Sequence, residues 1–409
     1  MRRFLPYLTV VLFAGPPAPA QEPPPQPGVS VQARGPVHEA FARPADPSAP
    51  KLVVPTQPPA PVNELPPDQR PEGDNVQWVP GYWSWDDEAS RFLWVSGCWR
   101  VPPPGREWVA GSWVEVAGGW QWQPGFWSAS GAVREFDSAP PDSLEAGPSA
   151  PPPNPDSYYI PGQWVFRDGN WLWQPGSWVR NPDGMVYVPP TYLPTPTGSL
   201  CVSGYWDYPL EDRGLLFAPV CFDGSPWAGN PGWCYRPSYA VGFGGLFGSL
   251  FARPGYGCYY FGNYFGAPYR GRGYVPWPAY ARRGYDPLLN YYGWANRGNP
   301  GWSRGLSGLY AGRLDGSLPA PATGFSRHGA TAGQAVGFDP ALISRNTVRF
   351  GRNVSVSPVN SLSTVAPLSR LDGGHVRLTN VTRPESVVRP NSPTRQTFAG
   401  AGRPSPAGP

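Results

Sequence analysis

The stretch YIPGQWVFRDGNWLWQPGSW, residues 159–178, decides the fold. Two aromatic-rich runs flank the dipeptide Asp168-Gly169, which is a strong signal for a two-residue hairpin turn. Pairing outward from that turn sets Trp164 opposite Trp173. Because side chains alternate between the two faces of a strand, the aromatic rings of both runs share one face of the predicted hairpin.

The two ends of this stretch are copies of one six-residue motif, in which glycine is fourth and aromatic residues come first and last. Within two blocks of the chain the glycines recur every 14 residues, after a first step of 16. Such a step accommodates two short strands and two tight turns, but not two helices. The copies are WVPGYW (78–83), WVSGCW (94–99), WVAGSW (108–113), WQPGFW (122–127), YIPGQW (159–164), WQPGSW (173–178) and CVSGYW (201–206).

Two further segments fit the motif less well. In YVPPTY (187–192), Pro190 replaces the glycine, and FAPVCF (217–222) fits only loosely. We expect the aromatic residues and glycines of the clear copies to be structural, as cross-strand pairs and turns. These positions are Trp78, Gly81, Trp83, Trp94, Gly97, Trp99, Trp108, Gly111, Trp113, Trp122, Gly125, Trp127, Tyr159, Gly162, Trp164, Trp173, Gly176, Trp178, Gly204 and Trp206.

The same register predicts hairpins elsewhere in the chain. One of them would set Arg100 against Glu107 on its solvent-facing side, as a cross-strand pair of opposite charge. The expected aromatic pairs are Trp113 with Trp122, Trp99 with Trp108, and Trp178 with Tyr187.

The Pro-Gly links between the hairpins leave two arrangements open. A two-residue turn at Pro175-Gly176 would continue a meander, and in the first block one aromatic row would run from Trp78 to Trp127. A type II turn splays hairpin strands, so the alternative is a corner that sends the chain into a second sheet. In both cases the fold is mainly β, with repeated antiparallel hairpins and an aromatic face, arranged as a meander or a two-layer sheet.

An aromatic row raises the question of what covers it. A buried Trp removes roughly 150–250 Å² from water, which is worth about 4–6 kcal/mol before opposing terms. Large exposed apolar patches mark binding surfaces. Either the two blocks cover each other's aromatic faces, or a ligand covers them.

Composition divides the chain into contrasting segments. The 409 residues include 60 Pro and 51 Gly, but also 20 Trp, 21 Tyr and 18 Phe, so ordered and disordered stretches must alternate. We expect a signal peptide (1–20), a Pro-rich disordered linker (21–75), β-repeat block 1 (76–136), a Pro-rich linker (137–157), β-repeat block 2 (158–222), a Gly/Tyr/Arg-rich region with short helices (223–313), and a mostly disordered basic tail (314–409).

Two Xaa-Pro steps predict helix starts in the C-terminal region. Asp286-Pro287 and Asn299-Pro300 have the form of an N-cap followed by proline in the first turn. They predict helices at 287–296 and 300–313. The net charge of residues 223–409 is +13, against −9 for residues 1–222. A basic tail can bind anionic surfaces, but a solvated tail is the simpler interpretation, and we expect no nucleic-acid partner.

The first 20 residues predict export to the periplasm, cell envelope or exterior. Arg2 and Arg3 precede a short apolar stretch, and Ala18-Pro19-Ala20 predicts cleavage after Ala20. That stretch is too short to span a bilayer, and no later segment is long and apolar enough. Export permits disulfides, although the five Cys can also be small apolar fillers. The candidates for pairing are Cys201, Cys221, Cys234 and Cys258, with Cys98 left over.

The motif copies resemble the WXXGXW repeats, also written YXWGXW, of a family of exported bacterial proteins. The resemblance covers 78–127 and 159–206. The chain departs from the pattern at Cys98, Pro190 and Cys201. The resemblance implies export and brings no catalytic residues with it.

Residue patterns that carry catalysis are scarce. The His residues are His38, His328 and His375, all in segments predicted to be disordered. Asp86-Asp87-Glu88 and Glu211-Asp212 fall in predicted loops, where we expect polar turn residues rather than Ca²⁺ ligands. No Cys-x-x-Cys pair or phosphate-binding loop occurs. We therefore expect no catalytic residue, cofactor or metal site.

Three functions remain after these exclusions. The favoured one is a non-enzymatic structural or interaction role in the cell envelope, with an envelope protein or polysaccharide as partner. The alternative is binding of glycans or cell-wall polysaccharide by stacking on exposed Trp and Tyr rings. A hydrolase with a carboxylate pair beside the aromatic row is the third.

Overall fold

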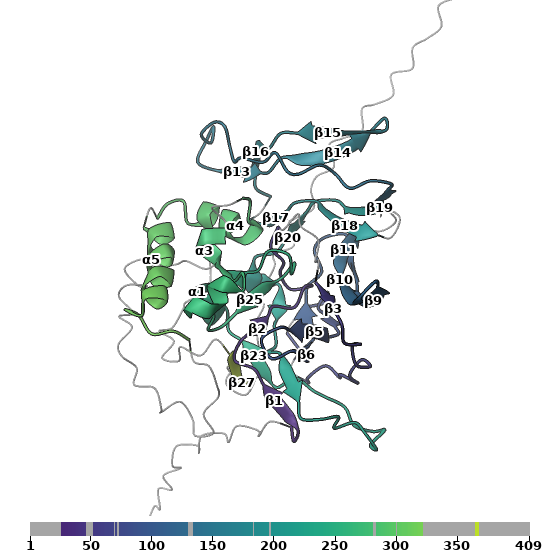
Figure 1. Cartoon of the computed structure of the whole chain (residues 1–409). Coiled ribbons are helices and arrows are strands. Elements are labelled where there is room, and N and C mark those ends of the chain that lie inside the picture. Colours follow the sequence, from purple (N-terminus) through teal and green to yellow (C-terminus); the bar gives the residue numbers. More distant parts are fainter. Residues whose placement is uncertain are drawn as a thin grey trace, which may run out of the picture.

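The computed structural model describes residues 26–45, 52–68, 70–71, 73–129, 134–182, 184–195, 198–280, 284–299, 301–321 and 365–367. The described chain is mainly β, with antiparallel hairpins, an aromatic-rich face and a small helical C-terminal part (Figure 1). The predicted fold class is thus confirmed. The predicted signal peptide and nearly all of the basic tail lie outside the described residues.

Two consecutive motifs combine into one four-stranded unit. The two inner strands form a tight hairpin, while the two outer strands lie beyond the Gly corners and pair with each other separately. The arrangement repeats four times. Unit 1 has β4 (Gln77–Val79), β5 (Tyr82–Asp86), β6 (Arg91–Val95) and β7 (Cys98–Arg100); unit 2 has β8 (Arg106–Val109), β9 (Ser112–Val116), β10 (Gly119–Gln123) and β11 (Phe126–Ala129). Unit 3 has β13 (Ser157–Ile160), β14 (Gln163–Arg167), β15 (Asn170–Gln174) and β16 (Ser177–Arg180); unit 4 has β17 (Val186–Val188), β18 (Thr191–Thr195), β19 (Gly198–Val202) and β20 (Tyr205–Asp207).

The inner hairpin of unit 3 has the predicted register. Trp164 pairs with Trp173, and their ring centroids are 5.2 Å apart on one face. The turn forms at Asp168 (φ 52°) and Gly169 (φ 80°), two left-handed residues as a type I′ turn requires. In unit 2 the predicted pair of Trp113 and Trp122 is also confirmed.

The predicted pairing between neighbouring hairpins is wrong. Trp99 pairs with Trp78 rather than Trp108, and Trp108 pairs with Trp127. Trp178 likewise pairs with Tyr159, while Tyr187 pairs with Trp206. The Arg100–Glu107 pair is absent, since Arg100 lies opposite Gln77 and Gly214 and Glu107 opposite Ser128.

The physical reason lies in the Gly links. Each link is a corner that carries the chain from the inner hairpin into the outer pair, so the inner and outer pairs form two sheets instead of one. The continuous row from Trp78 to Trp127 is therefore wrong, and the corner alternative is confirmed.

The first Pro-rich segment differs from the predicted disordered linker. Its described residues contain β1 (Val29–Val31), β2 (Gly35–Pro36) and β3 (Val53–Val54), which pair with β22, β25 and β10. The side chains of Val37 and Phe41 are fully buried. The segment lacks hydrophobic periodicity because it contacts sheet edges and aromatic rings in an irregular path rather than forming long elements of its own.

The C-terminal region supplies the largest hydrophobic core. A sheet in the order β2-β25-β24-β26 packs with short helices, which Figure 1 shows gathered on one side of the molecule, while unit 3 lies at its top. The remaining elements are β12 (Arg134–Phe136), a 3-10 turn (Leu210–Asp212), β21 (Gly214–Leu215), β22 (Val220–Phe222), β23 (Tyr239–Val241), α1 (Phe243–Ser249), β24 (Leu250–Ala252), β25 (Tyr259–Phe261), α2 (Ala267–Gly271), β26 (Val275–Pro276), α3 (Trp277–Tyr280), α4 (Pro287–Ala295), α5 (Trp302–Asp315) and β27 (Val365–Pro367).

Two predicted helices are present, and one loose motif is not a repeat. Helix α4 begins at Pro287, and the Asp286 carboxylate caps it by accepting from Leu289 N at 2.8 Å. Helix α5 begins at Trp302, two residues later than predicted, with Gly301 as its N-cap. The segment 217–222 does not form a unit, because β22 joins the edge of β6 in unit 1.

Candidate functional site

Each corner glycine lies beneath an aromatic ring of the partner motif. A β-carbon at Gly97 would lie 2.5 Å from Cζ2 of Trp78, and one at Gly162 would lie 2.4 Å from Cζ2 of Trp173. No side chain fits at that distance from a ring held by a strand. The glycine and the first aromatic residue of the motif are therefore coupled, although they belong to different copies.

A half-buried glutamate occupies the corner of unit 1. The Oε1 atom of Glu64 accepts from the indole N–H of Trp94 and from the backbone N–H of Gly97, both at 3.0 Å. Its Oε2 atom accepts from Gly81 N at 2.7 Å. Three N–H donors thus converge on one carboxylate that comes from outside the unit.

Units 2 and 3 repeat this arrangement with other glutamates. Glu39 accepts from the indole of Trp122 at 2.8 Å and from Gly125 N at 2.9 Å. In unit 3, Glu145 accepts from the hydroxyl of Tyr159 at 2.8 Å and from the backbone N–H of the glycine three residues later. In all three units the ring donor and the glycine belong to the same motif copy. We call this pair of donors, the first and fourth residues of one motif, the carboxylate clamp.

Two of the glutamates that the clamps bind are largely desolvated. Burial raises the pKa of Glu64 to about 7, although the three hydrogen bonds from Gly97, Gly81 and Trp94 act to lower it. Burial also raises the pKa of Glu39, against the charge of Arg43 and the hydrogen bonds of the clamp. Desolvation therefore outweighs the N–H donors at both sites.

Neither motif of unit 4 has both clamp donors, the ring at the first position and the backbone N–H at the fourth. Its first motif has the ring of Tyr187 but Pro190 at the fourth position, which has no N–H. Its second motif has Gly204 but begins with Cys201 in place of a ring. Arg106 instead donates to the carbonyl oxygen of Gly204 at 3.0 Å.

The clamp glutamates belong to three segments that cross the units, which we call straps. Strap 1 is residues 55–67, strap 2 is residues 36–45 and strap 3 is residues 137–156. The last Trp of a motif adds a second contact, because its indole N–H donates to a strap carbonyl. These hydrogen bonds run from Trp83 to Ala60 (2.9 Å), Trp127 to Ala40 (3.1 Å), Trp164 to Asp142 (3.1 Å) and Trp178 to Ala150 (3.0 Å).

The straps answer part of the question of what covers the aromatic faces. All 20 Trp lie in described segments, and none is exposed. The straps, which the sequence analysis assigned to linkers, cover part of the aromatic faces, and residues after the repeats cover other parts, since Phe217 packs on Trp78 and Trp227 packs on Trp83. The glutamates Glu39, Glu64 and Glu145 were missed because they lie in these predicted linkers. One signal was available: Glu64 is the single charged residue within 55–67.

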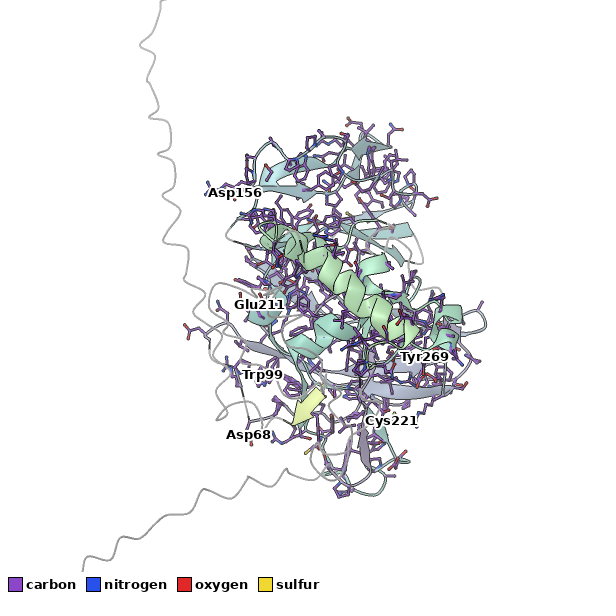
Figure 2. All side chains as sticks on the ribbon, turned by 90° about the vertical axis from the view of Figure 1, so that its left-hand side faces the viewer. Asp68, Trp99, Asp156, Glu211, Cys221 and Tyr269 are labelled. Atoms are coloured by element: carbon purple, nitrogen blue, oxygen red, sulfur yellow. The ribbon has the colours of Figure 1, made fainter. Side chains whose placement is uncertain are left out.

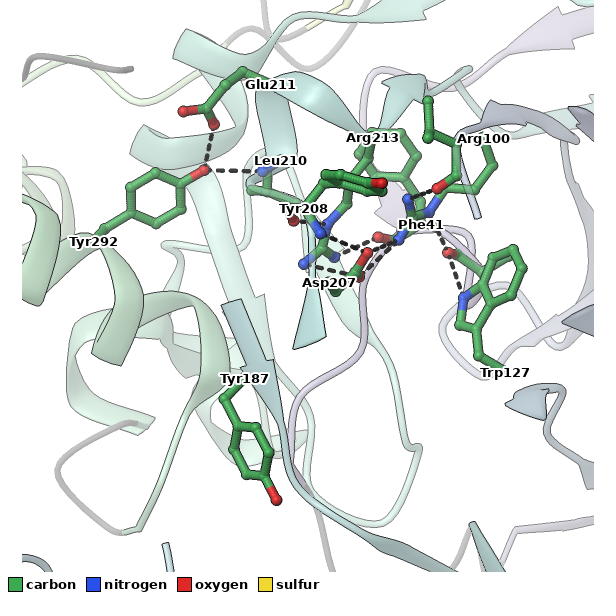
Figure 3. Close-up of polar contacts among 12 residues, drawn as sticks. Phe41, Arg100, Trp127, Tyr187, Asp207, Tyr208, Leu210, Glu211, Arg213 and Tyr292 are labelled. Atoms are coloured by element: carbon green, nitrogen blue, oxygen red, sulfur yellow. Dashed lines mark hydrogen bonds and ion pairs between the residues drawn. The ribbon is translucent and has the colours of Figure 1, made fainter. Parts of the chain in front are cut away.

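A buried charge cluster joins the repeats to strap 2 (Figure 3). The Arg100 guanidinium donates to both oxygens of Asp207, at 2.5 and 2.6 Å, and Arg213 lies 3.1 Å from the same carboxylate. The two arginines also donate to strap carbonyls, Arg100 to Ala40 at 2.9 Å and Arg213 to Phe41 at 2.6 Å. Burial lowers the pKa of Arg100, and the Asp207 charge opposes that effect. This cluster fixes strap 2 between units 1 and 4.

The acidic loop of unit 1 contacts the C-terminal region. It borders a pocket of about 230 Å³ that Arg34 and Arg253 also line. Arg253 donates to both oxygens of Asp87, at 2.9 and 2.7 Å, and Arg34 donates to Glu88 at 2.9 Å. Burial would raise the pKa of Asp87, but the bonds and charge of Arg253 lower it further. Asp86 accepts from the backbone of its own loop.

The second acidic loop is also engaged within the protein. The Glu211 carboxylate accepts from the hydroxyl of Tyr292 in α4 at 2.5 Å, as Figure 3 shows. Burial, together with the charge of Glu211, raises the pKa of Asp212 to about 6. Among the described residues, no group of three or more His, Cys, Asp or Glu is arranged to hold a metal ion.

His38 and the cysteines differ from their predicted states. His38 is buried in strap 2, where Nε2 lies 3.0 Å from the carbonyl of Pro80 and Nδ1 accepts from Ala40 N. Burial lowers the pKa of His38 to about 4. The described structure holds none of the predicted disulfides: Cys221, Cys234 and Cys258 are thiols, as is Cys98. His328 and His375 lie outside the described residues.

The described chain contains no helix that is both long and apolar enough to cross a bilayer. No family model matches the chain, and the searches of curated proteins and of solved structures found no match.

Proposed function

We propose that this protein is an exported, non-enzymatic member of the WXXGXW repeat proteins, with a structural or interaction role in the cell envelope. One observation carries the proposal. Three of the four aromatic units each receive a strap, and the strap enters through a carboxylate clamp. A design that is repeated to hold polypeptide segments suits a scaffold, since no unit is specialised for chemistry.

The acidic groups support this role over hydrolysis. Asp87 and Glu88 are each held by an arginine, and Glu211 is held by a tyrosine, so each is engaged in holding the fold together. His38 is buried and bonded on both ring nitrogens. Asp87 and Glu88 line the pocket of unit 1, but their ion pairs with Arg253 and Arg34 would have to break before either could act as a general acid or base.

The alternative of glycan stacking has less support. It needs Trp rings with a free face, but the described Trp are buried or half-buried. The half-buried rings of unit 3 come nearest to that requirement, and Trp164 and Trp178 already donate to strap 3.

Intrinsic fluorescence and polysaccharide sedimentation test the proposal together. We expect the purified full chain to show blue-shifted Trp emission that acrylamide quenches weakly, and not to sediment with peptidoglycan or insoluble polysaccharide. Sedimentation that is lost in Trp178→Ala would establish the glycan-binding alternative instead. Export is tested separately: the chain recovered from the periplasmic fraction should begin at Gln21.

A further inference from the structure

Strap 3 is held far less firmly than the other two straps. Nearly all of residues 137–156 are exposed, and Leu144 is 61% exposed. Strap 1 by contrast buries Val62, and strap 2 buries Phe41. Figure 2 shows Asp156, at the end of strap 3, on the outer edge of unit 3. Segments with few buried apolar contacts open at low free-energy cost.

Strap 3 is held at its end by Arg297 and Trp294, which both donate to Asp156, and along its length by a row of donors from the aromatic side chains of unit 3. Trp171 donates to the hydroxyl of Ser138 at 3.2 Å, Trp164 to the carbonyl of Asp142, and Tyr159 to Glu145. Trp178 then donates to the carbonyl of Ala150. The donors follow the strap in one direction, so unit 3 recognises an extended backbone with a carboxylate near its centre.

The clamp does not depend on how the strap is connected to the unit. Glu145 precedes its glycine by 17 residues, whereas Glu39 precedes Gly125 by 86. Strap 2 contains a turn, and strap 1 is a Pro-rich segment like strap 3, yet all three deliver a carboxylate to the same donors. A segment supplied by another chain meets the same geometric requirement.

Resting on the interaction role proposed above, we propose that unit 3 binds a Pro-rich, Glu-bearing segment of a partner polypeptide, which displaces strap 3. The partner segment would share the composition of strap 3, which it replaces on unit 3. Prolines favour the extended backbone, so little entropy is lost on binding. The glutamate gives specificity, because an N–H donor and a hydroxyl buried without an acceptor are costly.

The test uses the full chain and a synthetic peptide of residues 138–150, SAPPDSLEAGPSA. Binding is followed through the Trp fluorescence of the chain, since the peptide has none. Glu145→Ala in the chain weakens its own strap, so this variant should bind the peptide about 10-fold or more tighter than the wild-type chain does. The same peptide with Glu145→Gln should bind the variant about 10-fold more weakly, because the charge-assisted bonds are lost.

Two further variants separate the clamp from folding. Tyr159→Phe, added to the Glu145→Ala chain, removes one clamp donor and should weaken binding of the unmodified peptide more than binding of the Gln peptide, because a carboxylate accepts the stronger bond. Trp302→Phe lies in α5, away from unit 3, and should change neither affinity. Circular dichroism identifies chains that keep the wild-type fold, and the wild-type chain is titrated in parallel with excess peptide.

Three results would overturn the proposal. The first is equal binding of the two peptides, and the second is no binding to a folded Glu145→Ala chain. The third is a concentration-dependent dimer of the wild-type chain that Glu145→Ala abolishes, because the occupant is then a second copy. Failure of peptide binding would leave the quenching, sedimentation and export results unchanged, so it is distinguishable from failure of the proposed function.

Discussion

Gly125 lies directly beneath the indole of Trp108, so that a β-carbon at Gly125 would be 2.3 Å from Cζ2 of that ring and 2.8 Å from the carbonyl of Val109. The two residues belong to different motif copies that pair within unit 2. The motif thus requires glycine at this position because the ring across the strand leaves no room for a β-carbon, and not because the backbone is left-handed.

Gly125→Ala should therefore destabilise the protein by about 1–3 kcal/mol, because the added methyl overpacks a strand-held ring. Gly308→Ala is the matched control: Gly308 is exposed in α5 with no atom near its missing β-carbon. It should stabilise by roughly 1 kcal/mol through helix propensity. Urea unfolding of both variants measures the difference, and equal midpoints would refute the role of the corner.

The same relationship explains the one motif that lacks a glycine. In the register of unit 4, Cys201 pairs with Tyr192 as Trp94 pairs with Trp83 in unit 1. Pro190 therefore stands at the corner whose partner motif begins with a small side chain instead of a ring. The two departures from the pattern compensate each other, since a Pro ring fills space that an indole takes in the other units.

Asp207→Asn should cost about 3–5 kcal/mol, because it leaves Arg100 and Arg213 buried without a counter-charge. The side chains of both arginines are at most 3% exposed. In the control Asp68→Asn, the lost partner is Arg236, and the Asp68 side chain is 93% exposed. That change should cost about 0–1 kcal/mol. Thermal or urea unfolding that shows equal losses would contradict this ranking.

Sequence reasoning succeeded where the determinants are local and failed where they are not. Asp168-Gly169 fixes the register of its own hairpin, so the Trp164–Trp173 pair could be read directly. Nothing local distinguishes Trp78 from Trp108 as the partner of Trp99, because every copy of the motif presents the same residues. The choice follows from the corner angle, which one dipeptide does not encode.

The candidate site was hidden for a related reason. The rings and glycines were found because they recur, but Glu39, Glu64 and Glu145 occur once per strap at unequal distances from their units. Composition predicts disorder for Pro-rich segments because they cannot form a core of their own. Composition does not show that aromatic units elsewhere in the chain can bind these Pro-rich segments and order them.

Glu64 should make stability depend on pH. Its pKa rises from a usual value of 4.5 to about 7 on folding, so the folded chain holds the proton more tightly. Its contribution to stability is present in full below about pH 4.5 and is lost as pH rises through 7, by on the order of 3 kcal/mol. The difference in unfolding free energy between wild type and Glu64→Gln should shrink accordingly from pH 4.5 to 8. A difference independent of pH would refute this.

His38 acts in the opposite direction. Its pKa falls from 6.5 to about 4, so its contribution is present above pH 6.5 and is lost as pH falls through 4. The proton NMR signal of its imidazole should not titrate above pH 5. His38→Gln assigns the signal. A His38 resonance that titrates near 6.5 would show that the imidazole is exposed to solvent.

Cys98, Cys221, Cys234 and Cys258 should react as thiols in the unfolded chain, even after export, because they are thiols in the folded structure. In the native chain Cys98 and Cys258 should resist a thiol reagent at pH 8, since both are buried and burial raises the pKa of Cys258 to about 12. The half-buried Cys234 should react first. Peptide mapping after labelling distinguishes these sites. A disulfide between any two of these four cysteines in the exported protein would contradict the thiol state described.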